Sequence, residues 1–143
     1  MFEKILVALD GSDATDAVIG VAIGLAKKAG SAVEVVHVHE HDLITSKAGV
    51  SGVPLELETP AEGKQIVDGA LEKLKASGVT AHGTLVQAHT RDVPKRIIDA
   101  AGEVGADMII VGRRGLSNLE LMVVGSVSNK LVHLSPIPVL IAH

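Results

Sequence analysis

The sequence predicts an α/β fold, namely a doubly wound, five-stranded parallel sheet in the order 3-2-1-4-5 with helices on both of its faces. Short runs of apolar residues, almost unbroken by polar ones, are typical of strands that are buried on both faces. Between these runs lie segments in which apolar residues recur at helical spacing, and this alternation of strands and helices indicates a parallel sheet. Right-handed crossovers then restrict the chain to a few doubly wound strand orders.

Length and composition fit one domain over residues 1–143. A chain of 143 residues buries roughly two-thirds of the surface that its unfolded form exposes, which is enough for an ordinary core. Because 47% of the residues are hydrophobic but only 1% are aromatic, Val, Ile, Leu and Ala must build that core. The absence of Trp and Tyr also argues against single-stranded nucleic-acid binding by base stacking.

Charge and cysteine content exclude further classes of protein. The net charge is −4 and no run of Lys or Arg occurs, so we expect neither nucleic acid nor an anionic membrane surface as a partner. Without cysteine, disulfides, thiol catalysis and cysteine-ligated zinc are excluded. No apolar stretch approaches the roughly 20 residues of a membrane helix, and the N-terminal apolar run is too short for a signal sequence. We therefore expect a cytoplasmic protein with no membrane insertion.

The first part of the chain contains two expected strands with a helix between them. The strands are residues 4–9 (KILVAL) and 32–38 (AVEVVHV). Ser12 or Asp13 is the expected helix N-cap, and Gly30 is the expected C-cap. The helix itself is indicated by apolar residues at helical spacing, namely Ala14, Ala17, Val18, Val21, Ala22, Leu25, Ala26 and Ala29.

Residues 41–60 interrupt this alternation. The stretch has two glycines, two prolines and little periodicity, so we interpret it as a long loop, either disordered in part or a lid. A helix that ends at Gly78 follows, and a third strand over residues 80–88 comes next, with Gly83 as its weak point. The helix is marked by the apolar residues Ile66, Val67, Ala70, Leu71 and Leu74.

The last part of the chain repeats the pattern twice. Thr90 or Asp92 is the expected cap of a helix that ends at Gly105, and residues 107–112 (DMIIVG) form the fourth strand. A helix over about 126–134 precedes a fifth strand at residues 138–143 (PVLIAH). Since proline cannot donate to a sheet, we expect this strand at an edge. An uncovered apolar edge favours pairing with a second copy, which predicts a homodimer through Val139, Leu140 and Ile141.

The segment from Gly112 to residue 128 predicts a phosphate site. In open α/β sheets, ligands lie beyond the carboxyl ends of strands where the strand order reverses, which here means after the first and fourth strands. Glycine lets a backbone approach a phosphate closely, and the start of a helix binds anions. The alternative is that Gly112 only makes a turn and Gly125 only begins a helix. Neither G-x-x-x-x-G-K-[ST] nor G-x-G-x-x-G after the first strand is present.

The glycine spacing is the deciding pattern. The order is Gly112, two residues, Gly115, nine residues and then Gly125-Ser126. This spacing resembles the ATP-binding signature of the universal stress protein family. The stretches KILVALDGSDATDAVIGVAIGLAKKAGSAVEVVHV, ADMIIVGRRG and GSVSNKLVHLSPIPVLIA also look like the opening and closing parts of that family. The resemblance covers nearly the whole chain except residues 41–60, and it implies a Rossmann-like fold of the adenine nucleotide alpha hydrolase type.

The resemblance implies ATP as the ligand and a set of residues that hold it. Adenine and ribose would contact Ala8, Leu9, Asp10, Val38, Val111 and Gly112. The phosphates would pass along Arg113, Arg114 and Gly115, and the outer ones would be held by Gly125, Ser126 and Val127. A divalent metal, Mg²⁺ or Mn²⁺, would bridge the phosphates without a dedicated protein cage.

Two of these residues have alternative roles. The position of Arg113 is often a small polar residue in the family, so this long cation either reaches a phosphate or turns to solvent. Asp10 either accepts hydrogen bonds from the nucleoside or simply ends the strand and orients the next turn.

Other polar residues give weaker indications. His37, His39 and His41 alternate along a strand and would share one face, which is compatible with a metal site, although His41 already falls in the expected loop. The scattered His82, His89, His133 and His143 are interpreted as surface or loop residues. A response-regulator receiver has a similar rhythm, but the third strand ends in LVQAH and the fifth in LIAH, so its phosphoacceptor Asp and its Lys are missing.

The predicted function is that of an ATP-binding regulator or sensor in the stress response, which acts through contacts with a regulatory protein partner whose identity is unknown. It is not expected to be an enzyme. The alternatives are an interaction module of the same fold without useful nucleotide affinity, and a slow ATP-hydrolysing enzyme, although nothing in the sequence looks like a base positioned for water.

Overall fold

The computed structural model describes residues 1–43, 54–55, 58–113 and 126–143. In these ranges the main sheet has five strands, all parallel, in the order β5-β2-β1-β6-β7. This is the predicted 3-2-1-4-5 order, so the predicted fold class is confirmed. The strands are β1 (Lys4–Leu9), β2 (Ala32–Glu40), β5 (Ala81–Ala88), β6 (Met108–Gly112) and β7 (Val139–Ala142).

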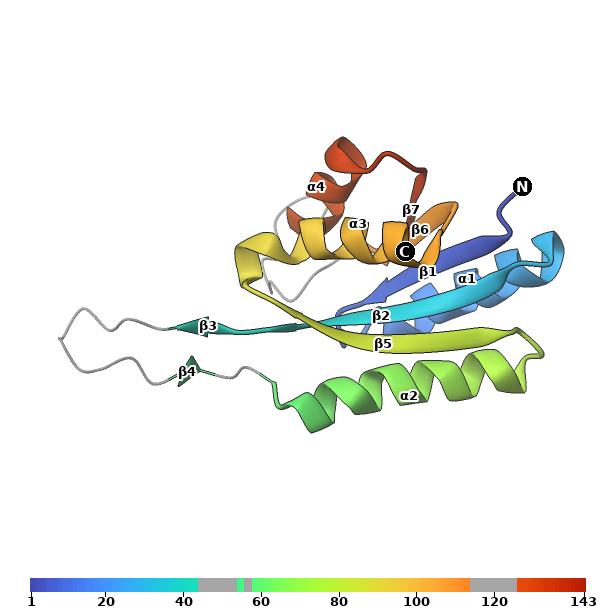
Figure 1. Ribbon diagram of the computed structural model, residues 1–143. Helices are drawn as coiled ribbons and strands as arrows, with labels where there is room; N and C mark the ends of the chain where they lie inside the picture. Colours follow the sequence, from blue (N-terminus) through green and yellow to red (C-terminus); the bar gives the residue numbers. More distant parts are fainter. Residues whose placement is uncertain (44–53, 56–57, 114–125) are drawn as a thin grey trace, which may run out of the picture.

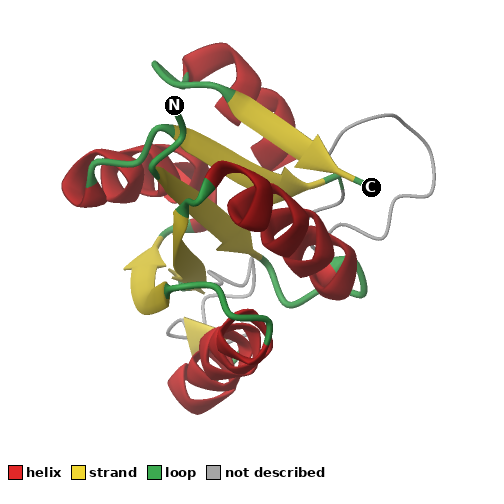
Figure 2. Cartoon of the chain, turned by 90° about the vertical axis from the view of Figure 1, so that its right-hand side faces the viewer, coloured by secondary structure: helices red, strands yellow, loops and turns green. Residues whose placement is uncertain are grey.

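Four helices cover the two faces of this sheet within the described ranges (Figures 1 and 2). The helices α1 (Thr15–Ala29) and α2 (Pro60–Ala76) cover one face, and α3 (Val93–Val104) and α4 (Ser126–Leu134) cover the other. Alternate residues of β1 belong to two separate cores, with Ile5, Val7 and Leu9 toward α1 and α2, and Leu6 and Ala8 toward α3 and α4. The unbroken apolar run in the sequence therefore reflects burial on both faces.

The start of α1 differs from the sequence-based expectation. The N-cap is Ala14 with no side-chain cap, so the prediction of Ser12 or Asp13 is wrong. The polar side chains serve the preceding turn instead, because Asp10 Oδ1 accepts a hydrogen bond from the Ser12 N–H at 2.9 Å. Ser12 Oγ in turn accepts one from the Ala14 N–H at 3.3 Å. The predicted C-cap at Gly30 is confirmed by its left-handed backbone, with a φ of 72°.

The stretch 41–60, predicted to be a long loop, contains short elements. The two-residue strands β3 (Asp42–Leu43) and β4 (Pro54–Leu55) pair antiparallel, and Figure 1 shows β3 continuing the line of β2 beyond the sheet. The helix α2 begins at Pro60, well before its apolar pattern, because Thr59 and Glu62 form a capping box. Hydrogen bonds from the Thr59 backbone and side chain hold the pKa of the Glu62 carboxyl below its ordinary value.

The start of α3 also uses its polar residues differently from the expectation. A single 3-10 turn, η1 (Thr90–Asp92), precedes the helix, and Asp92 occupies the N-cap position without a side-chain hydrogen bond. Thr90 does not cap the helix but donates its hydroxyl to Glu40 Oε2 at 3.2 Å. The side chain of Thr90 therefore connects η1 to the end of β2. No helix in the described part of the chain is long and apolar enough to cross a membrane.

Gly83 has a packing role in β5 and is not simply a weak point of the strand. A Cβ placed on Gly83 would lie 2.5 Å from Val67 Cγ1 and 3.2 Å from Leu71 Cδ1, both in α2. Such distances are far below van der Waals contact, so α2 can lie this close to β5 only because the residue is glycine.

We expect Gly83→Ala to lower the free energy of unfolding by about 1–3 kcal/mol, because the added methyl group forces α2 away from the sheet. Urea unfolding of both proteins measures this difference. Gly69→Ala is the matched control, since a Cβ at Gly69 meets nothing within 4 Å and should stabilise the helix by about 0.5–1 kcal/mol. Equal effects of the two substitutions would contradict the close approach.

Candidate functional site

A cleft lies at the carboxyl ends of β1, β2 and β6, on the face that α3 and α4 cover. It encloses about 480 Å³ of space not filled by protein atoms, part of it open to solvent. The residues that line it are Ala8, Leu9, Asp10, Val38, Glu40, Val93, Ile97, Val111, Gly112, Val127 and Ser128. They come from three strands and two helices that are far apart in the sequence.

The position of the cleft follows from the strand order. From β1 the chain continues to β2 and β5 on one side, and β6 and β7 occupy the other side. β1 and β6 are direct neighbours, with Ala8 opposite Val111 in a parallel register. Because the connections leave these two strands in opposite directions, their carboxyl ends are left uncovered and a crevice opens between them.

The wall of the cleft is mainly apolar. Val38 and Val111 are 7% exposed, and Val93 and Ile97 of α3 are buried as well. Polar groups are few, namely the carboxylates of Asp10 and Glu40 and the hydroxyl of Ser128. A cleft of this kind suits a flat apolar ring that carries a few hydrogen-bonding atoms.

Asp10 has one of the two roles expected of it, because it orients the turn after β1. Its Oδ1 atom accepts the Ser12 N–H, so the carboxylate is oriented at the end of β1. Asp10 also lines the cleft, and the two roles are compatible because a carboxylate has two oxygens that accept hydrogen bonds.

Ser128 is a cleft residue that sequence reasoning missed. Its side chain is 1% exposed, and its hydroxyl donates to the carbonyl oxygen of Gly112 at 2.7 Å. This bond ties the first turn of α4 to the end of β6, so the two ends of the glycine segment are held together. The signal in the sequence was the serine two positions after Ser126, within the first turn of the expected helix.

Glu40 was also missed. It is two residues beyond Val38 on the same face of β2, as the alternation of a strand requires, and its carboxylate is held by Thr90. The alternation from Val38 could have indicated it, but the expected strand ended at residue 38, whereas β2 extends to Glu40.

The structure brings together one part of the predicted nucleotide site. Seven predicted residues line the single cleft described above, namely Ala8, Leu9, Asp10, Val38, Val111, Gly112 and Val127. Arg113 is exposed and does not line it, and its backbone N–H donates to the Ala142 carbonyl oxygen at 3.0 Å. Arg114, Gly115 and Gly125 lie outside the described residues, and Ser126 begins α4. Nucleotide binding by these residues stays a prediction.

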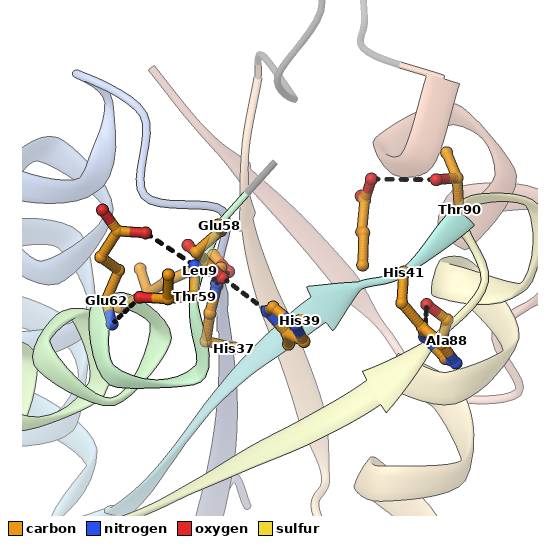
Figure 3. A network of polar contacts seen from close by, with 10 residues as sticks. Leu9, His37, His39, His41, Glu58, Thr59, Glu62, Ala88 and Thr90 are labelled. Carbon is orange, nitrogen blue, oxygen red and sulfur yellow. Dashed lines mark hydrogen bonds and ion pairs between the residues drawn. The ribbon is translucent and has the colours of Figure 1, made fainter. Parts of the chain in front are cut away.

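The histidines of β2 lie on the opposite face from the cleft. His37 and His39 are both 2% exposed and both contact Glu58 (Figure 3). Directly after β2, His41 stacks on His89 with ring centroids 4.7 Å apart. Among the described residues no group of three His, Cys, Asp or Glu side chains is arranged to hold a metal ion. His82, His89, His133 and His143 are exposed, as expected.

A second depression lies between the first turn of α1 and α2, on the face opposite the cleft. It encloses about 770 Å³, is more open, and is lined by Asp13 and Asp16 among other residues. Asp16 forms an ion pair with Lys73. More than half of the residues that line this depression are polar or charged, whereas the cleft between β1 and β6 has mainly apolar walls. The cleft is therefore the better candidate for a ligand with a flat apolar ring.

Comparison with known proteins identifies the family. All residues from 1 to 143 match the sequence model of the universal stress protein family. The chain belongs to this family. This universal stress protein is 36% identical to universal stress protein YxiE of Bacillus subtilis over 149 aligned positions, which cover 99% of both chains.

Solved structures of other universal stress proteins have the same fold. A universal stress protein from Archaeoglobus fulgidus superposes with a TM-score of 0.76 at 25% identity, covering 100% of both chains. A structure of the universal stress protein from Archaeoglobus fulgidus in complex with dAMP has a TM-score of 0.71 at 24% identity, covering 99% of this chain and 98% of that one.

In this universal stress protein we expect Ser128→Ala to lower the free energy of unfolding by about 1–2 kcal/mol, because the Gly112 carbonyl loses its donor. Thermal or urea unfolding measures the change. Ser135→Ala is the matched control, since Ser135 makes a similar 2.7 Å bond to the Ile137 carbonyl at the other end of α4 but is less buried. A Ser128→Ala effect no larger than that of the control would contradict the role of the buried bond.

Proposed function

We propose that this universal stress protein binds ATP in the cleft between β1 and β6 and acts as a nucleotide-dependent regulator or sensor in the stress response. The observation that carries the proposal is the convergence of β1, β2, β6 and α4 on one cleft, with Gly112, the first glycine of the family's ATP-binding signature, in its wall. The output would be contact with a regulatory protein partner, in the cytoplasm.

The chemistry of the cleft matches the two ends of a nucleotide. The adenine ring would lie against the apolar walls formed by Val38, Val111 and Ile97, where its burial is favourable. Asp10 and Glu40 would accept hydrogen bonds from the nucleoside, because carboxylates repel phosphates and therefore cannot face the other end. The phosphates would then extend toward the first turn of α4, whose unpaired N–H groups attract anions.

Two further observations support an adenine nucleotide. The Archaeoglobus fulgidus structure with dAMP has the same fold as this chain. The sequence also continues from Val111 and Gly112 into the expected glycines of the signature. A divalent ion, Mg²⁺ or Mn²⁺, would be held mainly by phosphates and water, since the described residues offer no group of three ligands for it.

We assign the cleft a binding role and not a catalytic one. Its two described carboxylates already have hydrogen-bond partners, Ser12 for Asp10 and Thr90 for Glu40. A general base must be within hydrogen-bond reach of the water that it activates, and we assign the remaining acceptor capacity of these carboxylates to the nucleoside end of the ligand, away from the phosphates.

We also propose that the protein is a homodimer through β7. In the described part of the chain, β7 lies at the margin of the sheet and pairs only with β6 (Figure 2). Val139, Leu140 and Ile141 are only partly buried. A second copy would cover this edge and supply partners for its backbone groups.

ATP at about 100 times its Kd should stabilise the fold by about 2.7 kcal/mol, which raises the melting temperature by several degrees for a domain of this size. Thermal unfolding with and without millimolar ATP, in the presence and absence of Mg²⁺, measures the shift. Absence of any shift would contradict nucleotide binding and favour an interaction module of the same fold.

Gly125→Val should remove the ATP-induced shift and leave a folded protein, because a side chain at the expected phosphate contact blocks close approach of the backbone. Gly102→Val is the control, since Gly102 lies in α3 and a Cβ there meets nothing within 4 Å. If Gly125→Val responds to ATP as fully as the control, the phosphates lie elsewhere.

Leu140→Lys should convert the proposed dimer to a monomer, because a charged side chain on an edge strand disfavours edge-to-edge pairing. Sedimentation equilibrium gives the molar mass, and circular dichroism checks that the variant is folded. Thr80→Lys places the same charge at an exposed position before β5 and should leave the mass unchanged. A wild-type mass equal to that of one chain would overturn the dimer.

A further inference from the structure

His37 occupies a buried position between the carboxyl end of β1 and the start of α2. Its side chain is 2% exposed, and it faces away from the nucleotide cleft. The residue directly preceding the α2 N-cap is Glu58, and its carboxylate reaches back onto the sheet to meet His37 (Figure 3).

Both ring nitrogens of His37 face oxygen atoms that only accept hydrogen bonds. Nδ1 is 2.7 Å from the carbonyl oxygen of Leu9. Nε2 is 2.7 Å from Glu58 Oε2 and 3.0 Å from Oε1. A neutral imidazole carries one N–H and one lone pair, so a neutral His37 would direct that lone pair at either a carbonyl or a carboxylate.

We propose that His37 is a buried imidazolium ion paired with the Glu58 carboxylate, and that the pair is a proton-dependent clamp joining the end of β1 to the start of α2. With both nitrogens protonated, His37 donates to Leu9 and to Glu58 at the same time. Such charge-assisted hydrogen bonds are short, as the two 2.7 Å distances are.

The surroundings of the pair favour this assignment. His39 adds a second ring nitrogen, Nδ1, at 3.3 Å from Glu58 Oε2, so the carboxylate is the common acceptor of two histidines. A Cβ at Gly63 of α2 would lie 3.1 Å from Glu58 Oε2, 3.3 Å from His37 Cδ2 and 2.9 Å from Leu85 Cδ1 of β5. A glycine at this position therefore lets α2 close over the pair.

Other charged groups of the packed elements are turned elsewhere. On α2, Glu62 bonds to Thr59 and Lys64 pairs with Asp68, all at exposed positions. On β1, Asp10 bonds to the turn at Ser12, and β5 contributes the apolar Leu85 opposite His37. The Glu58 side chain is 22% exposed, which gives protons a path between the pair and solvent.

The clamp has a definite direction of response to pH. As the pH rises and the proton is lost, a lone pair of His37 faces an acceptor, and the junction between Glu58 and the first turn of α2 is released. At the β1 end of the clamp, Leu9 and its neighbour Asp10 line the cleft. After loss of the proton, the Leu9 carbonyl would accept from a neutral and no longer from a charged donor, which would weaken nucleotide binding. This consequence rests on the proposed function, whereas the charged pair itself does not.

Nitrogen NMR of the histidine rings tests the proton count directly. In the wild-type protein at pH 7.5, we expect His37 to show two protonated nitrogens. In Glu58→Gln the amide N–H can donate to Nε2, so His37 should become neutral with its proton on Nδ1. Glu62→Gln is the control, because it removes a nearby carboxylate that does not face the histidine and keeps the capping box. A wild-type His37 ring protonated on one nitrogen alone would overturn the proposal.

The pH dependence of stability gives a second readout that needs no ligand. A folded state that holds the proton loses stability as the pH rises, whereas a folded state with neutral His37 loses stability as the pH falls. Between pH 6 and 8, the ratio of the wild-type to the Glu58→Gln unfolding equilibrium constants should therefore change by up to about tenfold per pH unit. A ratio that is independent of pH would contradict a proton held by the pair.

ATP titrations of the wild-type and Glu58→Gln proteins over the same pH range test the link to the cleft. We expect the wild-type Kd to increase with pH and the Kd of Glu58→Gln to change less. If neither protein binds ATP, the proposed function fails while the NMR result stands on its own. If both bind with the same pH dependence, the coupling between clamp and cleft is wrong.

Discussion

The burial of β1 on all sides is the constraint on which the rest of the structure depends. Its residues Ile5 to Val7 are at most 1% exposed, with β2 and β6 on its edges and a pair of helices on each face. A strand in this position must be apolar along its buried part, which here runs from Ile5 to Leu9. Its carboxyl end is the place where polar groups can appear again, and Asp10 is the first of them.

Two different polar systems use this end of β1. On the α3 and α4 face, the cleft collects Asp10, Glu40 and Ser128 around apolar walls. On the α1 and α2 face, the Leu9 carbonyl accepts from His37. Because the side chains of β2 alternate, Val38 and Glu40 face the first system while His37 and His39 face the second. One pair of adjacent strands thus serves a candidate ligand site and a buried ion pair.

The fold was predictable from the sequence because it depends on periodicity and on the alternation of elements, which are local patterns. The strand order and the positions of Ala8, Val38, Val111 and Val127 around one cleft follow from these patterns and the family resemblance. The interactions of Ser128, Glu40 and Glu58 were not predictable, since each joins residues that are distant in the sequence. Glu58 lies in a stretch without periodicity. Thr90 looked like a helix cap because nothing near it in the sequence shows that its hydroxyl donates to Glu40.

The cleft also makes the two ends of the chain depend on each other. Ala8 lies in the first strand and Val127 in the last helix, yet both line the same space. A ribosome-bound chain that has released only its first hundred residues would possess the strand end but no opposing wall. An occupant that touches both would therefore bind only a chain in which α4 has already packed against the sheet.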